Sequence, residues 1–253
     1  MRTVHATRYL TPLREGGSVP AIMEADDSGT YVVKFRGAAQ GVRALIAEVI
    51  GGELARLLEL PVPQLVAIDV DPVLARSEPD AEIQELLKAS GGINIGLDYL
   101  PGSLNWEPAM PAVDPGLAAK IVWFDALITN VDRTARNPNM LRWHKQLYLI
   151  DHGAALYFHH DWPNHAAKAR LPFAPIAQHA LVKVASSIVE ADAALAPRVT
   201  AEALRAIVAE IPDDYLTAEA TPAATREAYV AYFVERLTAP RAFVEEAERV
   251  RIG

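Results

Sequence analysis

The sequence predicts an α+β protein of two lobes, in which a β-rich N-terminal third precedes a helical remainder. Segments rich in β-branched and aromatic residues, bounded by Gly, Pro and Asp, recur through the first third of the chain. From residue 115 onward, apolar residues recur mainly at helical spacing. A change from strands to helices along one chain is typical of the α+β class. We therefore expect an N-terminal lobe over residues 1–97 and a C-terminal lobe over residues 98–253.

The expected elements of the first lobe surround one main helix. Residues 19–25 and 30–35 flank the turn sequence DDSG and predict a β-hairpin. The stretch 41–60 places Leu and Val near helical spacing and predicts a helix, although Gly51 and Gly52 interrupt it. Further strands are expected within 61–72 and 90–103, separated by an acidic segment at 72–92 that is helical at best.

The second lobe is expected to be helical with one interruption. Two short strands around the polar turn WHKQ are predicted within residues 139–153. Helices are predicted at 114–130, 177–195, 200–211 and 224–251.

Composition excludes several classes of protein. The formal charge of −8, without a long basic block, argues against direct nucleic-acid binding, which depends on neutralising phosphates. The chain has no Cys, so disulfides and thiolate metal sites are excluded. The start lacks the apolar region of a secretory signal, and no uncharged run approaches the roughly 20 residues of a membrane helix. We expect a cytoplasmic protein that does not contact a membrane.

Four separated features together have the charges that phosphoryl transfer requires. Lys34 ends a strand, Glu48 lies on the next helix, and Asp151 follows the apolar strand LYLI. The polar loop between a helix and a strand carries Asp132 and, five positions later, Asn137. In such a site a Lys holds the phosphates, an acid orients that Lys, an Asp positions the attacking hydroxyl, and an Asn and a second Asp hold Mg²⁺.

At these positions the sequence resembles the HipA-like branch of the protein-kinase-like superfamily, whose catalytic loop is also similar to that of phosphatidylinositol kinases. DRTARN at 132–137 is similar to the family's D-x-x-x-x-N loop, and IDHG at 150–153 to its metal-binding segment. AEVIGGELARLLELPVP at 47–63 is similar to its acid-bearing helix and the following strand. The resemblance covers roughly residues 14–155 and implies a bilobal kinase fold that uses ATP and Mg²⁺.

The resemblance also implies roles for individual residues. Asp132 would be the catalytic Asp, Lys34 the phosphate-binding Lys and Glu48 its ion-pair partner, while Asn137 and Asp151 would hold Mg²⁺. Glu53 competes with Glu48, and Asn139 with Asn137; the family spacing favours the earlier residue of each pair. Arg133 and Pro138 are expected to serve as loop scaffolding.

Other candidates concern the nucleotide. No G-x-G-x-x-G is present, so REGGS at 14–18 is the best phosphate-cradling loop, through the main-chain N–H groups of Gly16, Gly17 and Ser18. The adenine is expected against a hinge formed by Asp98, Tyr99 and Leu100. Arg136 is either a positive group that stabilises the transferring phosphoryl or a solvated loop residue.

Several functions remain open at this point. We expect a kinase that phosphorylates a Ser or Thr of a protein or of itself. A nucleotide-binding pseudokinase or regulatory module and a small-molecule kinase are the alternatives, and the resemblance suggests an antitoxin-like regulatory partner. A metallohydrolase would use His152, His159, His160 and Asp161 as ligands, with Asp132 and Asp151 adding carboxylates. However, no H-x-H or H-E-x-x-H spacing is present.

Overall fold

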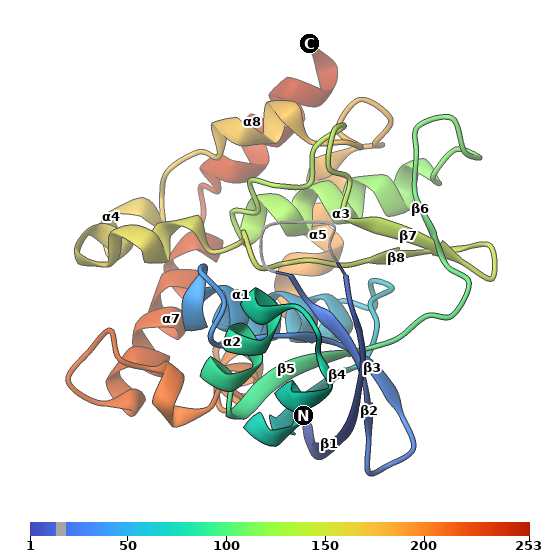
Figure 1. The fold of residues 1–253 in the computed structure, drawn as a ribbon. Helices are drawn as coiled ribbons and strands as arrows, with labels where there is room; N and C mark the ends of the chain where they lie inside the picture. The colour runs from blue at the N-terminus through green and yellow to red at the C-terminus, as the bar shows by residue number, and fades with distance from the viewer. Residues whose placement is uncertain (14–18) are drawn as a thin grey trace.

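The structure is a computed structural model that describes residues 1–13 and 19–253 (Figure 1). A β-barrel forms from the first part of the chain, and a mostly helical region follows it. This order confirms the α+β class that the sequence predicts.

Within the part of the chain that the structure describes, five strands close into the barrel in the order β1, β2, β3, β5, β4. They are β1 (Arg2–Pro12), β2 (Ala21–Ala25), β3 (Thr30–Lys34), β4 (Leu65–Val70) and β5 (Gly92–Asp98). The predicted hairpin is confirmed, because β2 and β3 pair antiparallel with Met23 opposite Tyr31. Strand β1 was not predicted; it pairs parallel with β4, with Val4 opposite Ile68, and this pairing closes the barrel.

The barrel has its own hydrophobic cluster, which lies between the strands and two helical segments. Met23, Tyr31 and Phe35 are buried in it. The segment after β4, expected to be acidic and helical at best, covers this cluster as the 3₁₀ helix η1 (Pro72–Ser77) and the helix α2 (Ala81–Ala89). Asp80 caps α2 by accepting a hydrogen bond from the main-chain N–H of Glu82.

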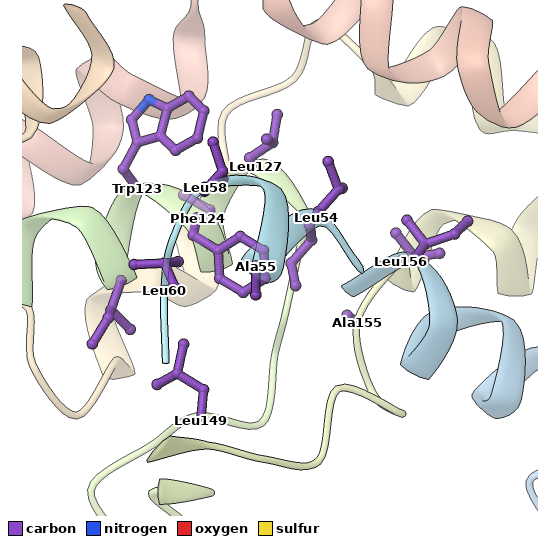
Figure 2. Packing of buried hydrophobic residues seen from close by; sticks show 14 of the residues in the cluster. Leu54, Ala55, Leu58, Leu60, Trp123, Phe124, Leu127, Leu149, Ala155 and Leu156 are labelled. Carbon is purple, nitrogen blue, oxygen red and sulfur yellow. The ribbon is translucent and has the colours of Figure 1, made fainter. Parts of the chain in front are cut away.

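Helix α1 (Gly41–Leu57) is buried on all sides along its central turns. Its apolar side chains share one hydrophobic cluster with those of α3 (Pro115–Leu127), and Figure 2 shows Leu54 and Phe124 among its members. A helix surrounded by protein is apolar around its whole circumference, which explains why its pattern is nearly continuous rather than one-sided. The core of α1 therefore continues into the helical region, and the lobe boundary at residues 97 and 98 stays a prediction.

Gly51 and Gly52 allow α1 to approach its neighbours closely. A Cβ at residue 51 would lie 2.7 Å from Cβ of His152, while a Cβ at residue 52 would lie 2.2 Å from the terminal Cδ1 of Leu65. The Cβ of His152 cannot move without its main chain, whereas the Leu65 methyl can rotate away. The two glycines are therefore constrained to different degrees.

Gly51→Ala is expected to lower the free energy of unfolding, and Gly52→Ala to lower it less. Overpacking costs about 1–3 kcal/mol, which exceeds the roughly 1 kcal/mol by which Ala favours a helix over Gly. Urea denaturation of both variants beside the wild type measures the difference. Equal or reversed costs would contradict the close approach of α1 to His152.

The helical region carries a second, small sheet of β6 (Leu104–Asn105), β7 (Met140–Trp143) and β8 (Gln146–Leu149). The two strands expected around WHKQ are confirmed as β7 and β8. The remaining helical elements are η2 (Tyr157–Asn164), α4 (His165–Lys168), η3 (Ala174–Gln178), α5 (Ile188–Leu195), η4 (Ala196–Arg198), α6 (Ala201–Val208), η5 (Asp213–Tyr215), α7 (Pro222–Leu237) and α8 (Ala242–Ile252). Among the described residues, no helix has the length and apolar character needed to cross a membrane.

Two of the predicted helices were wrong in extent. The helix expected at 177–195 begins only at α5, where Ser187 accepts a hydrogen bond from the main-chain N–H of Glu190 at 3.2 Å. Before it, the main chain of Ala180 bonds to the carbonyl of Arg133 at 3.0 Å rather than to a helical turn. The helix expected at 224–251 divides into α7 and α8, because Pro240 has no N–H to continue the ladder.

Candidate active site

Lys34 at the end of β3 lies between two carboxylates from different parts of the chain. Its Nζ forms an ion pair with Oε1 of Glu48 on α1 and donates a hydrogen bond of 2.6 Å to Oδ1 of Asp151. The side chain of Glu48 is fully buried, whereas that of Asp151 is 46% exposed. The three residues are separated by up to 117 positions, so the fold alone brings them together.

The charges in this triad stabilise one another. Burial alone would lower the pKa of Lys34, but Glu48 and Asp151 outweigh it and raise that pKa. Burial raises the pKa of Glu48, against the opposing effect of Lys34. Burial would also raise the pKa of Asp151, but Lys34 brings it down to about 2. Asp151 is therefore ionised at neutral pH, and Lys34 stabilises its charged form.

Backbone geometry aims Asp151 at this point. Asp151 has a φ of 56°, in the left-handed region that costs energy for a residue with a side chain. Thr129 and Asn139, on either side of the polar loop, also have positive φ. A Cβ on Gly153 would lie 3.3 Å from Oε1 of Glu48, so a larger residue would press on the buried carboxylate. Positive φ values at residues with side chains, such as those of Asp151, Thr129 and Asn139, cluster at functional sites.

The polar loop presents Asp132 with two amide donors. Oδ2 of Asp132 accepts hydrogen bonds from Nδ2 of Asn137 at 2.8 Å and from Nδ2 of Asn139 at 3.2 Å. Among the described residues, none donates a hydrogen bond to its other oxygen, Oδ1. Because its amide nitrogen is committed to Asp132, Asn137 has its amide oxygen left to serve as a ligand.

The structure distinguishes the two candidate acids, but not the two candidate Asn residues. Glu53 pairs with Arg56 on the same helix and not with Lys34, so Glu48 is the acid beside the Lys. Asn137 is exposed and Asn139 half-buried, and both contact Asp132, so the choice between them stays a prediction.

A depression of about 540 Å³ opens beside the predicted hinge. It is lined by Leu10, Thr11, Ile22, Thr30, Asp98, Tyr99 and Pro101. Leu100, the third hinge candidate, is buried and does not line it. Neither Lys34 nor Asp151 lines the depression, so its apolar walls and the charged triad are separate parts of the surface.

Two further sets of candidates were expected to act on the phosphates. Gly16, Gly17 and Ser18 lie outside the described residues. Arg136 is exposed on the polar loop and makes no hydrogen bond or ion pair with any residue that the structure describes.

The histidines do not assemble a metal centre. His159 is buried and its Nδ1 lies 3.2 Å from the hydroxyl of Tyr229, while His152 is buried edge-on against the ring of Phe124. Burial lowers the pKa of each of these two imidazoles to about 3, so both are neutral at neutral pH. Within residues 1–13 and 19–253, no group of three His, Cys, Asp or Glu side chains could hold a metal ion.

Sequence reasoning missed two polar residues beneath the loop. Asp125 on α3 and His179 after η3 are buried. Asp125 pairs with Arg133 of the loop, and His179 in turn pairs with Asp125. A signal for Asp125 was present, because it is the one acid in the apolar run KIVWFDALI, and a buried acid needs a partner. The sequence carries no comparable signal for His179.

Comparisons with known proteins identify the family and the fold. A sequence model of the family described as HipA-like kinase matches residues 7–242. The crystal structure of the Helicobacter pylori proinflammatory kinase CtkA is similar, with a TM-score of 0.59 over 99% of this chain and 98% of that chain. The two sequences are 13% identical, so this likeness shows the fold alone. The search of curated proteins found no match.

Proposed function

The chain belongs to the HipA-like kinase family, and as a kinase it uses ATP; from this premise we propose that it phosphorylates a Ser or Thr hydroxyl of a protein or of itself. The observation that best supports a working active site is the ion-paired Lys34, held between Glu48 and Asp151. A Lys positioned in this way by an acid on the neighbouring helix binds nucleotide phosphates in kinases. We assign Lys34 and Glu48 these two roles.

The nucleotide would extend along β3 from the hinge to the triad. Thr30 lines the depression and Lys34 ends the same strand, with alternate residues on one face. Four residues of strand span about 13 Å, which suits an adenine in the depression and phosphates at Lys34. Asp98 and Tyr99 would then contact the base.

Asp132 is the residue that we propose to orient the acceptor. Its Oδ2 is held by the two loop amides, which leaves Oδ1 to accept a hydrogen bond from the attacking hydroxyl. The exposed Arg136 lies four residues further on, where its charge would offset the negative charge of the transferring phosphoryl.

The donor set fits Mg²⁺. A hard cation takes oxygen ligands and is held in kinases by one or two protein side chains together with the phosphates. Asp151 supplies an ionised, partly exposed carboxylate, and Asn137 an amide oxygen whose nitrogen is already committed. When bound, the ion would neutralise charge on the phosphates and fix their orientation.

If the chain phosphorylates itself, its sequence restricts which segments can contain the phosphorylated residue. Residues 135–185, which include the segment after Asp151, contain no Ser or Thr. That segment is held by the chain's own contacts, such as the 2.7 Å hydrogen bond from the N–H of Leu156 to the carbonyl of Ile128. A phosphorylated Ser or Thr of the chain would therefore lie outside this range.

Incubation with γ-labelled ATP and Mg²⁺ tests the proposal. We expect label on the protein itself or on proteins of a cell extract, in acid-stable phosphoserine or phosphothreonine. Mg-ATP at about 100 times its Kd should also stabilise the folded chain by about 2.7 kcal/mol, measured by thermal unfolding.

The other outcomes separate the alternatives. Stabilisation by ATP without transfer to any acceptor would identify a nucleotide-binding pseudokinase or regulatory module. Label that appears only on small alcohols, such as aminoglycosides, would identify a small-molecule kinase. Absence of both stabilisation and transfer would contradict nucleotide binding altogether.

A further inference from the structure

Arg133 is a buried cation that joins two segments of the candidate active site. Its guanidinium Nη1 donates a hydrogen bond to the carbonyl oxygen of Asn139 and lies 3.4 Å from that of Ile150. Asn139 closes the loop that carries Asp132, and Ile150 directly precedes Asp151. The main-chain N–H of Ile150 also donates to the carbonyl of Asn139 at 3.0 Å. One side chain therefore fixes the loop against the segment that carries Asp151.

The opposite side of Arg133 is held by Asp125. Nε of Arg133 donates to Oδ2 of Asp125 at 2.6 Å, and neither side chain is exposed. Burial would raise the pKa of Asp125, but Arg133 and His179 lower it below its usual range, so this carboxylate stays ionised. A buried, charge-assisted pair of this kind has few alternative geometries.

His179 and Asn130 complete the support. Nδ1 of His179 accepts the main-chain N–H of Leu181 at 3.0 Å, so its Nε2 carries the proton and donates to Asp125 at 2.9 Å. Asn130 donates to the other oxygen of Asp125 at 2.9 Å and accepts the main-chain N–H of Asp132 at 3.1 Å. The network thus reaches the main chain of Asp132 as well.

We propose that Arg133, held by Asp125 and His179, is a positioning residue that sets the distance between the Asp132 loop and Asp151. The inference rests on the proposed function, in which the hydroxyl acceptor is oriented by Asp132 and Mg²⁺ is held from Asn137 and Asp151. These groups act together only if the two segments keep one relative placement, and the guanidinium of Arg133 contacts both segments. A Lys carries the charge but cannot reach Asp125 and two carbonyls at once.

Arg133→Lys tests the proposal, with Arg236→Lys as a matched control. Arg236 is also buried and also binds carbonyl oxygens, those of Ala126, Leu127, Ala169 and Leu171, but it contacts neither the Asp132 loop nor Ile150. Both variants lose hydrogen bonds of a buried guanidinium, so thermal unfolding should show comparable losses of stability. His179→Asn, which removes one donor to Asp125, is a milder second variant should Arg133→Lys fail to fold.

Three readouts distinguish positioning from general support. Mutating a residue that orients metal ligands typically lowers metal affinity or activity by about 10–100-fold, so Arg133→Lys should lower kcat by about this factor. It should also weaken Mn²⁺ binding, measured by electron paramagnetic resonance with a non-hydrolysable ATP analogue, while KM for ATP changes little. Hydrogen exchange of the nucleotide-free protein should be faster in residues 132–139. Arg236→Lys should leave all three near their wild-type values.

The outcomes are distinct from those of the function test. Equal kcat, Mn²⁺ affinity and loop exchange in Arg133→Lys and Arg236→Lys would overturn the positioning role while leaving the kinase assignment intact. A wild-type chain that transfers no phosphoryl group would overturn the proposed function. The exchange measurement needs neither nucleotide nor metal, so it still decides whether Arg133 holds the loop.

Discussion

Asp132→Asn is expected to abolish phosphoryl transfer while ATP still binds. A positioned general base contributes about 10²–10⁴-fold to a rate, and the Asn amide cannot replace a carboxylate oxygen that accepts the proton of the hydroxyl. The fold of the loop should survive, because the amide oxygen of the new side chain can still accept hydrogen bonds from Asn137 and Asn139. Single-turnover transfer of labelled phosphate measures the rate, and a fluorescent ATP analogue measures binding.

Asp69→Asn is the control for this variant. Asp69 lies on β4 with a side chain that is 42% exposed, and among the described residues it pairs only with His5. The same chemical change there should alter neither the rate nor the binding. Transfer by Asp132→Asn at the wild-type rate would show that the acceptor is oriented by another group. Loss of ATP binding together with transfer would instead indicate that the loop had collapsed.

The sequence predicts the local parts of this fold well, for physical reasons. The β2–β3 hairpin, α1 and the two strands around WHKQ each follow from a pattern within a short window, because turn residues and apolar spacing act locally. The limits of α5 and the break between α7 and α8 depend on Ser187 and Pro240, which a reading by apolar spacing alone overlooks.

The same local patterns could not predict which distant segments pair with each other. Strand β1 closes the barrel by pairing parallel with β4, some sixty residues away. The residues of β1 do not indicate which strand it pairs with. The Lys34, Glu48 and Asp151 triad was expected from charge types and a family resemblance, and the fold brings these three side chains into contact. The support beneath Asp132 was not expected, since His179 lies in a stretch that reads as helix but folds as turns.

Lys34→Met is expected to remove both activity and stability, and the two losses can be separated. The variant loses the cation that binds the phosphates, so phosphoryl transfer should fall below detection. It also leaves the buried carboxylate of Glu48 and the nearby Asp151 without their partner. Breaking a buried ion pair by removing one member costs about 3–5 kcal/mol, so urea denaturation at pH 8 should show a large loss.

The pH dependence of this loss has a definite sign. Burial already raises the pKa of Glu48, and Lys34 is the group that opposes the rise. Without Lys34, the folded state therefore binds a proton at Glu48 more tightly than the unfolded state does. Stability then falls as pH rises through the pKa of the folded state, and it recovers as pH is lowered. The deficit of Lys34→Met relative to the wild type should shrink between pH 8 and pH 5.

The double variant Lys34→Met/Glu48→Gln separates the two roles of the pair. Gln is close in shape to Glu and carries no charge, so the variant should regain much of the stability at pH 8 that Lys34→Met lost, because a buried uncompensated carboxylate is gone. It should remain inactive, since the phosphate-binding cation is still missing. Restored stability with no transfer would assign Glu48 to holding Lys34 and Lys34 to the phosphates. A double variant that regains transfer would contradict both roles, whereas one as unstable as Lys34→Met would place the cost of losing Lys34 at Asp151 rather than at Glu48.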